Sequence, residues 1–335
     1  MEKILDVNDL HVTFTTYGGT VKAVRGVSFD LHKGETLAIV GESGCGKSVT
    51  SNAIMQLIPD PPGKISNGTI TFKGKELTTI PEKEMRSIRG VDISMIFQDP
   101  MTALNPTLTI GTQLTEGLME HRKMSSAEAK EKALEMMELV GIPNPQERLK
   151  QYPHQFSGGM RQRIVIAIAL ICEPELLIAD EPTTALDVTI QAQILELFEQ
   201  VQEKTGVSII LITHDLGVVA KIADRIVVMY AGKIIEEGTR KEVFYEGQHP
   251  YTRGLLKSVP RLDIKGEKLI PIDGTPPDLF SPPQGCPFTA RCPMAMEVCD
   301  KVYPLQTELS ETHKVDCWLQ DERAKQLLAQ AADKN

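Results

Sequence analysis

The chain has 335 residues, 41% of them hydrophobic and 24% charged, which is ordinary for a globular protein that can build a sizeable core. Its formal net charge of −9 argues against nucleic acid as a partner. The longest apolar run, residues 164–172, is far shorter than the ~18 residues of a membrane-spanning helix, and the N-terminus does not resemble a signal peptide. We therefore expect a cytoplasmic protein. If it works at a membrane, partner proteins must hold it there.

Strands are predicted through most of the first forty residues, and two short ones follow before residue 100. The first forty residues are rich in β-branched side chains and are interrupted by Gly18-Gly19 and Lys33-Gly34, which is typical of strands joined by turns. The last of these strands runs directly into a glycine-rich turn and then a helix. We expect strands at residues 4–7, 10–15, 21–31, 36–40, 69–72 and 93–97.

Helices and buried strands alternate farther along the chain. Residues 110–150 contain strong helix formers and predict helices. The apolar runs at residues 176–179 and 207–212 are typical of buried parallel strands, and a helix over residues 190–204 separates them. Strands joined by crossover helices predict a parallel sheet.

Proline and glycine become frequent after about residue 247, and the periodicity of helices and strands fades there. We therefore divide the chain into a main domain over residues 1–246, with a helical subdomain over about 105–170, and a loop-rich appendage over residues 247–335.

Residues 41–48 fit the phosphate-binding pattern G-x-x-x-x-G-K-[ST] between a strand and a helix. The glycines let backbone N–H groups surround phosphates, and the helix N-terminus adds positive charge. We expect Lys47 to reach the β and γ phosphates of ATP and Ser48 to ligate Mg²⁺, whereas Cys45 needs no redox role. The candidate nucleotide-binding residues of this segment are Gly41, Ser43, Gly44, Cys45, Gly46, Lys47, Ser48 and Val49.

Two acids follow the apolar strand at residues 176–179. In P-loop enzymes an Asp at such a strand end holds Mg²⁺, and we expect Asp180 to do so. Glu181 would then face the γ phosphate and act as the general base that polarises the attacking water.

A second anion site is predicted where Ser157, Gly158 and Gly159 open a helix. A Ser at the N-cap with two glycines after it leaves backbone N–H groups free to bind an anion. Two phosphate sites so far apart in one chain suggest that each nucleotide lies between two copies of such a domain.

At this point the sequence resembles the ATP-binding-cassette (ABC) ATPases. Ser157-Gly158-Gly159-Met160 is similar to their signature motif, and four further segments resemble family elements in the expected order. The resemblance implies an α/β P-loop cassette with a RecA-like parallel core, an antiparallel β section and a helical subdomain. It also implies that two cassettes close over two ATP molecules.

The resemblance assigns roles to the residues of those four segments. Gln98 would contact Mg²⁺ and the transmembrane partner, and His214 would contact the γ phosphate as the switch histidine. Together with Glu181 they form the expected catalytic set. Asp187, in Ala185-Leu186-Asp187, would belong to the D-loop. Tyr17 would stack on adenine, with Phe14 as the alternative.

The C-terminal part narrows the resemblance. Residues 247–256, 285–288 and 291–293 are similar to the ATPase subunits of dipeptide and oligopeptide importers. Such an importer implies a second, paralogous ATPase, two transmembrane permease subunits and an extracytoplasmic peptide-binding protein, with this chain on the inner face of the cell membrane. Importers of nickel or glutathione are the alternative within the group. A soluble ABC ATPase that remodels a macromolecular complex is the alternative of a different class.

Four cysteines crowd into the appendage: Cys286, Cys292, Cys299 and Cys317. Their spacing is wider than the close pairs of structural zinc sites, so we expect a [4Fe–4S] cluster, with zinc or unligated cysteines as alternatives. Some ATPases that this chain resembles carry such a cluster. We expect a structural role for it, because a loop-rich segment with few apolar residues needs cross-linking. Asp300, Asp316 and His313 are expected at the surface.

Overall fold

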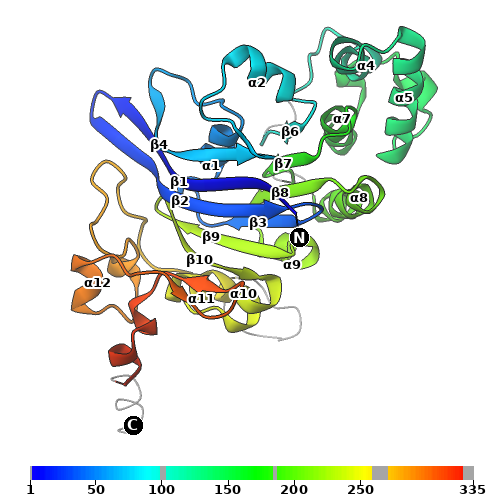
Figure 1. Cartoon of the computed structure of the whole chain (residues 1–335). Helices are drawn as coiled ribbons and strands as arrows, with labels where there is room; N and C mark the ends of the chain where they lie inside the picture. Colours follow the sequence, from blue (N-terminus) through cyan, green and yellow to red (C-terminus); the bar gives the residue numbers. More distant parts are fainter. Residues whose placement is uncertain (1, 99–102, 184–186, 259–270, 327–335) are drawn as a thin grey trace.

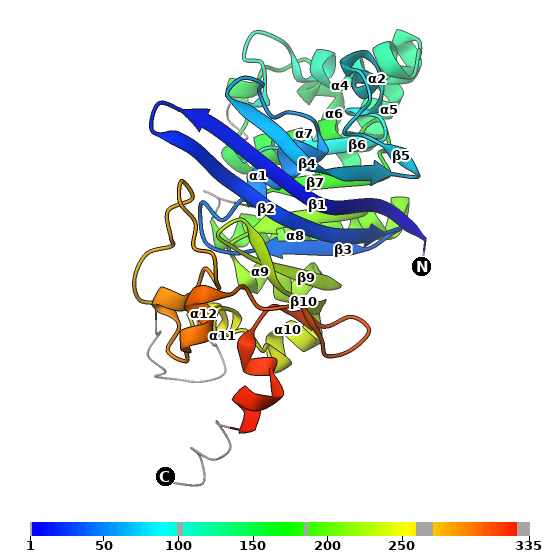
Figure 2. The same cartoon turned by 60° about the vertical axis from the view of Figure 1, so that its left-hand side comes forward.

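The computed structural model describes residues 2–98, 103–183, 187–258 and 271–326. It contains one sheet of eight strands and one of four. Figures 1 and 2 show the long β1–β2 ribbon lying across the middle of the molecule, with helices at one end and the C-terminal appendage at the other. None of the helices in these ranges has the length and hydrophobicity needed to cross a membrane.

The four-stranded sheet is antiparallel, in the order β2-β1-β4-β5. Its strands are β1 (Lys3–Thr16), β2 (Gly19–His32), β4 (Gly63–Phe72) and β5 (Lys75–Glu76). The sequence predicted two strands where β1 is continuous. Asp9, at φ 44°, lies where the register of β1 shifts, so the irregularity is a bulge that the strand absorbs and not a turn.

The eight-stranded sheet has the order β11-β12-β10-β9-β3-β8-β7-β6, and the five strands from β9 to β6 are parallel, as predicted. Its strands are β3 (Thr36–Val40), β6 (Ile93–Ile96), β7 (Leu176–Asp180), β8 (Ser208–Thr213), β9 (Arg225–Tyr230), β10 (Lys233–Thr239), β11 (Thr307–Glu308) and β12 (Lys314–Val315). The last two strands come from the appendage, which therefore extends the central sheet.

Helices cover the larger sheet on both faces. Eleven are described: α1 (Lys47–Ile54), α2 (Glu82–Ile88), α4 (Ile110–His121), α5 (Ser126–Leu139), α6 (Pro145–Arg148), α7 (Gly158–Leu170), α8 (Val188–Thr205), α9 (Leu216–Ile222), α10 (Arg240–Glu246), α11 (Pro250–Lys257) and α12 (Glu297–Lys301). Three short 3₁₀ turns are η1 (Pro153–Gln155), η2 (Thr289–Arg291) and η3 (Trp318–Gln320). The predicted helical stretch over 110–150 is thus three helices separated by turns.

The core alternates along each buried strand. In β7, Leu176 and Ile178 pack toward α1 and the four-stranded sheet, whereas Leu177 and Ala179 pack toward α4, α5, α7 and α8. A third cluster joins β9 and α9 to α11 and the rest of the appendage, with Tyr230, Tyr251 and Phe288 at its centre. Because apolar side chains leave β7 on both faces, its carboxyl end is held rigidly where Asp180 and the acid after it emerge.

Candidate functional site

The loop between β3 and α1 has the backbone that the phosphate-binding pattern predicted. Gly41 and Gly46 adopt φ values of 152° and 102°. A Cβ atom on Gly41 would lie 2.2 Å from the Met229 carbonyl oxygen, and one on Gly46 would lie 2.6 Å from the Ala23 carbonyl oxygen. Only glycine fits these two positions, so packing against neighbouring strands sets the shape of the loop.

Lys47 folds back over this loop. Its Nζ donates hydrogen bonds to the carbonyl oxygens of Gly41 at 2.8 Å and Glu42 at 3.1 Å. Ser43 and Gly44 form the exposed apex, and Cys45 is buried, with its thiol 3.8 Å from the Lys47 ammonium. Burial raises the pKa of Cys45, which agrees with a packing role.

Ser48 and Asp180 meet beside the loop. The Ser48 hydroxyl donates a 3.1 Å hydrogen bond to Asp180 Oδ1, which joins the start of α1 to the end of β7. Burial raises the pKa of Asp180, partly offset by the bond from Ser48, and the charge of Glu181 raises it further. A buried carboxylate next to a hydroxyl provides the oxygen ligands that Mg²⁺ prefers.

Glu181 lies where three predicted residues come together. Its Oε2 accepts a 2.9 Å hydrogen bond from Gln98 Nε2, and its Oε1 lies 3.3 Å from His214 Nδ1. Its φ of 48° is unusual for a residue with a side chain, and its N–H donates to the Ile212 carbonyl. Gln98, Glu181 and His214 follow β6, β7 and β8, so adjacent parallel strands bring them to one edge of the sheet.

The predicted signature segment packs in a different layer from the phosphate-binding loop. Ser157 caps α7, accepting a 3.4 Å bond from the Met160 N–H, and both Ser157 and Gly158 are exposed. Helix α7 packs with α4, α5 and β6, whereas α1 packs with β1, β2 and β7. The helices whose N-termini were predicted to bind anions therefore belong to different packing layers of this chain.

The start of α7 touches the start of α8. A Cβ on Gly159 would lie 3.0 Å from Ile190, and Asp187 caps α8 by accepting a 2.9 Å bond from the Ile190 N–H. Ala185 and Leu186, the remainder of the predicted D-loop, lie outside the described residues.

The sequence alone did not identify Gln162 as important. This residue is fully buried, and its Nε2 donates a 2.7 Å bond to the Pro182 carbonyl, directly after Glu181. A polar residue at the start of an apolar helix was the available signal. Through this bond Gln162 connects the signature helix to the end of β7, where the expected general base lies.

Tyr17 and Phe14 differ clearly in exposure. Tyr17 is fully exposed at the tip of the β1–β2 ribbon, whereas Phe14 packs against the core. Of the two aromatic candidates, only Tyr17 is free to stack on a planar ligand. Val49, also predicted as a nucleotide-binding residue, is partly buried and packs against the same core.

The four appendage cysteines line one small cavity together with His249. All are free thiols, and three are buried. Burial raises the pKa of Cys286 to about 11 and that of Cys317 to about 12, and the neighbouring cysteines add to both shifts. Within the described ranges, however, no group of three or more His, Cys, Asp or Glu side chains is arranged to hold a metal ion. The structure of the described residues therefore does not support the metal site predicted in the appendage.

Two surface predictions in the appendage were wrong. His313 is buried, and its Nε2 lies 2.8 Å from Glu236 Oε1. Asp316 accepts a 2.7 Å bond from the Tyr303 hydroxyl, and burial raises its pKa to about 6. Strand β12, which contains Lys314 and Val315, pairs with β10; of its two flanking residues, His313 is buried and Asp316 is partly buried. Asp300 is exposed, as expected.

Family models match both parts of the chain. A model described as "ABC transporter" matches residues 24–184. A second, described as "Oligopeptide/dipeptide transporter, C-terminal region", matches residues 235–299.

Curated relatives match over almost the whole length. The chain is 72% identical over 324 residues to the dipeptide transport ATP-binding protein DppD of Bacillus subtilis, covering 97% of each chain. It is 60% identical over 318 residues to the oligopeptide transport ATP-binding protein OppD of the same organism, covering 95% of this chain and 89% of the relative.

Solved structures of cassettes share the fold. A dimeric structure of the ATP-binding cassette MJ0796, in a post-hydrolysis state bound to ADP and Pi, is 27% identical with a TM-score of 0.63, over 70% of this chain and 98% of that one. The cbiO1 protein of Clostridium perfringens, part of the ABC transporter complex cbiONQ, is 29% identical with a TM-score of 0.63. The match covers 74% of this chain and 93% of that one. The chain thus belongs to the ABC transporter ATPases, in the group that carries the oligopeptide/dipeptide transporter C-terminal region.

Proposed function

We propose that this chain binds MgATP at the β3–α1 loop and hydrolyses it to power the import of di- or oligopeptides. The observation that carries the proposal is the convergence of Gln98, Glu181 and His214 on one sheet edge, with the Ser48–Asp180 pair beside it. The cargo is inferred from the relatives, whose names specify dipeptide and oligopeptide transport. Neither nickel, nor glutathione, nor the remodelling of a soluble complex is favoured by those relatives.

Each residue of the site has a proposed task. Lys47 and the backbone N–H groups of residues 41–48 bind the β and γ phosphates. Ser48, Asp180 and Gln98 hold Mg²⁺, which neutralises phosphate charge when bound. Glu181 accepts a proton from the attacking water, and His214 orients the γ phosphate. Tyr17 stacks on adenine.

A second cassette completes each site. Ser157, Gly158 and Gly159 lie in a different packing layer from α1, so we infer that they bind the γ phosphate held by the P-loop of a paralogous subunit. Asp187, beside Gly159, then lies at the interface between the subunits. Binding of ATP stabilises the closed pair, and hydrolysis releases it.

The proposed complex contains two permease subunits in the membrane, with this chain peripheral on its inner face and an extracytoplasmic binding protein supplying peptide. Nucleic acid is not a proposed partner. In this proposal the cassette spans residues 1–246 and the appendage spans residues 247–335. The helical subdomain of the cassette, about residues 105–170, faces the permeases.

We also propose that Cys286, Cys292, Cys299 and Cys317 ligate a [4Fe–4S] cluster. A single zinc ion needs its sulfur ligands within about 2.3 Å of one point, whereas a cluster spreads one thiolate to each of four irons. Four thiols lining one cavity match the number of ligands that such a cluster needs.

Purification of the tagged chain from detergent-solubilised membranes tests the transport proposal. We expect two multi-spanning proteins and a second, different ABC ATPase to copurify, with ATP hydrolysis that depends on Mg²⁺. Recovery from the soluble fraction alone, with ribosomal or DNA-bound partners, would overturn transport while leaving the ATPase in place.

A further inference from the structure

We propose that Arg291, in the C-terminal appendage, is a positioning residue for the phosphate-binding loop and acts on it through Glu42. The inference rests on the proposed function, because it requires that this loop binds the phosphates of ATP. Arg291 and Glu42 are 249 residues apart in the chain. The appendage thereby becomes part of the nucleotide site.

The contact between the two side chains is bidentate. Arg291 Nη1 donates to Glu42 Oε2 at 2.6 Å, and Nη2 donates to Oε1 at 2.9 Å. The side chain of Arg291 is 4% exposed and that of Glu42 is 27% exposed. A paired guanidinium fork of this kind fixes orientation as well as charge, so Arg291 holds Glu42 in one rotamer.

Arg291 is itself rigidly held. Its Nε donates to the Asp273 carbonyl at 2.8 Å, Nη2 to the Ile272 carbonyl at 3.1 Å, and Nη1 to the Tyr230 hydroxyl at 3.1 Å. The guanidinium also lies over the ring of Phe288. These partners belong to the appendage and to β9. Arg291 therefore connects the phosphate-binding loop to the third core cluster, and the packing of that cluster fixes where the guanidinium lies.

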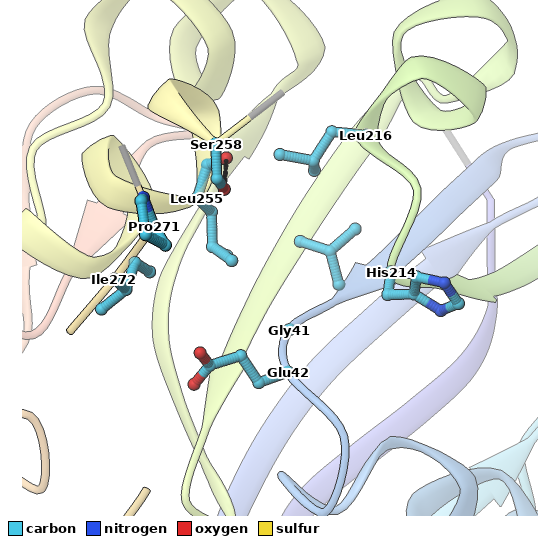
Figure 3. A pocket seen from close by; sticks show the side chains of 9 residues that line it. Gly41, Glu42, His214, Leu216, Leu255, Ser258, Pro271 and Ile272 are labelled. Atoms are coloured by element: carbon cyan, nitrogen blue, oxygen red, sulfur yellow. Dashed lines mark hydrogen bonds between the residues drawn. The ribbon is translucent and has the colours of Figure 1, made fainter. Parts of the chain in front are cut away.

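The backbone of Glu42 is held from both sides. Its N–H donates to the hydroxyl of the buried Tyr251 in α11 at 2.8 Å, and its carbonyl accepts from Lys47 Nζ at 3.1 Å. Figure 3 shows the Glu42 carboxylate extending toward Pro271 and Ile272, on the opposite side from His214. One residue of the loop thus links the appendage to the lysine that we propose contacts the phosphates.

The negative charge of Glu42 explains why Arg291 should affect the binding of ATP. Glu42 is one of the four unspecified positions of the phosphate-binding pattern, and it places a carboxylate in a loop proposed to bind a triphosphate. Without Arg291 that negative charge is uncompensated and repels the phosphates, and the loop loses its support. Glu42→Gln removes the repulsive charge, so it should partly rescue an Arg291 variant.

The test measures ATP affinity of the full-length chain by displacement of a fluorescent ATP analogue, with melting temperature as the check on folding. We expect Arg291→Gln to weaken ATP binding about tenfold, equivalent to about 1.4 kcal/mol. The double variant Arg291→Gln/Glu42→Gln should bind ATP more tightly than Arg291→Gln alone. Arg291→Lys keeps the positive charge but loses the two-pronged contact, so the ATP affinity of this variant should lie between those of the wild type and Arg291→Gln. It replaces Arg291→Gln in the test if the latter does not fold.

The matched control is Arg323→Gln, which removes an exposed appendage arginine paired with Asp321 and should leave affinity unchanged. Equal ATP affinity in the Arg291→Gln and Arg323→Gln variants would overturn the inference, as would a double variant no better than Arg291→Gln. In either case the wild-type chain would still bind ATP and the proposed function would stand. Failure of the folded wild-type chain to bind ATP would contradict the proposed function itself.

Discussion

Gln98 Nε2 donates a 2.9 Å hydrogen bond to Glu181 Oε2 across 83 residues of sequence. The opposite oxygen of the same carboxylate lies 3.3 Å from His214 Nδ1. The carboxylate of Glu181 is thereby oriented from two sides, which is the arrangement a positioned general base requires.

Glu181→Gln should leave ATP binding intact and lower the rate constant of hydrolysis by about 10²–10⁴-fold, because the amide keeps the shape of the side chain but cannot accept the proton. Steady-state hydrolysis and nucleotide binding are measured in parallel. The ATP-bound dimer should also accumulate.

The control is Glu203→Gln, which changes an exposed acid of α8 and should hydrolyse ATP normally. Normal turnover by the Glu181→Gln variant would refute the assignment of the base.

Lys47→Ala should weaken ATP binding at least about tenfold, because each hydrogen bond to a charged partner contributes about 1.5–3 kcal/mol. Isothermal titration with MgATP measures the affinity. Lys64→Ala, an exposed lysine of β4, should bind like the wild type. Unchanged affinity in the Lys47→Ala variant would contradict the phosphate-binding role of this loop.

Protein purified without oxygen should be brown and contain about four irons per chain. Cys317→Ser should lose the colour and most of the iron, whereas Cys172→Ala, a buried cysteine outside the cavity, should keep both. Metal analysis by mass spectrometry, together with visible absorbance, distinguishes the outcomes. A colourless protein with one zinc per chain would rule out the cluster.

Glu242 should stabilise the packing of the appendage loop on α10 in a pH-dependent way. Burial opposes its ionisation, but hydrogen bonds from Ser310, Thr239 and Thr312 outweigh it and lower its pKa from 4.5 to about 2. Because the folded pKa lies below the unfolded one, the stabilisation is complete above pH 4.5 and is lost as the pH falls toward 2.

Glu242→Gln should therefore lower the free energy of unfolding by about 1 kcal/mol at pH 7, after allowance for solvent screening. The difference from wild type should shrink below pH 4.5 in urea titrations at several pH values. Glu246→Gln, an exposed neighbour, should show no such trend. A difference that stays constant down to pH 3 would disprove the carboxylate contribution.

The local parts of the site could be predicted from the sequence because they depend on neighbouring residues. The glycines, Lys47 and Ser48 follow one another in the chain, and an apolar strand directly precedes Asp180 and Glu181. The parallel sheet was likewise predictable, since its strands are continuous apolar runs separated by helices. These features were confirmed as elements of the fold.

Other features depended on contacts that no local pattern encodes. His313 was expected at the surface, but the pairing of β12 with β10 buries it against Glu236. The continuity of β1 depends on its two neighbours, β2 and β4, which hold it on either side of the bulge at Asp9.

The sequence by itself determined the phosphate-binding loop, the acids at the strand end, the cassette family and the grouping of four cysteines, because each is a matter of residue type and spacing. Only the tertiary structure brought Gln98, Glu181 and His214 together, and only it joined Arg291 to Glu42. The physical reason is that these contacts form between separate strands and between the appendage and the core. Their geometry follows from packing of whole elements, which periodicity along the chain does not specify.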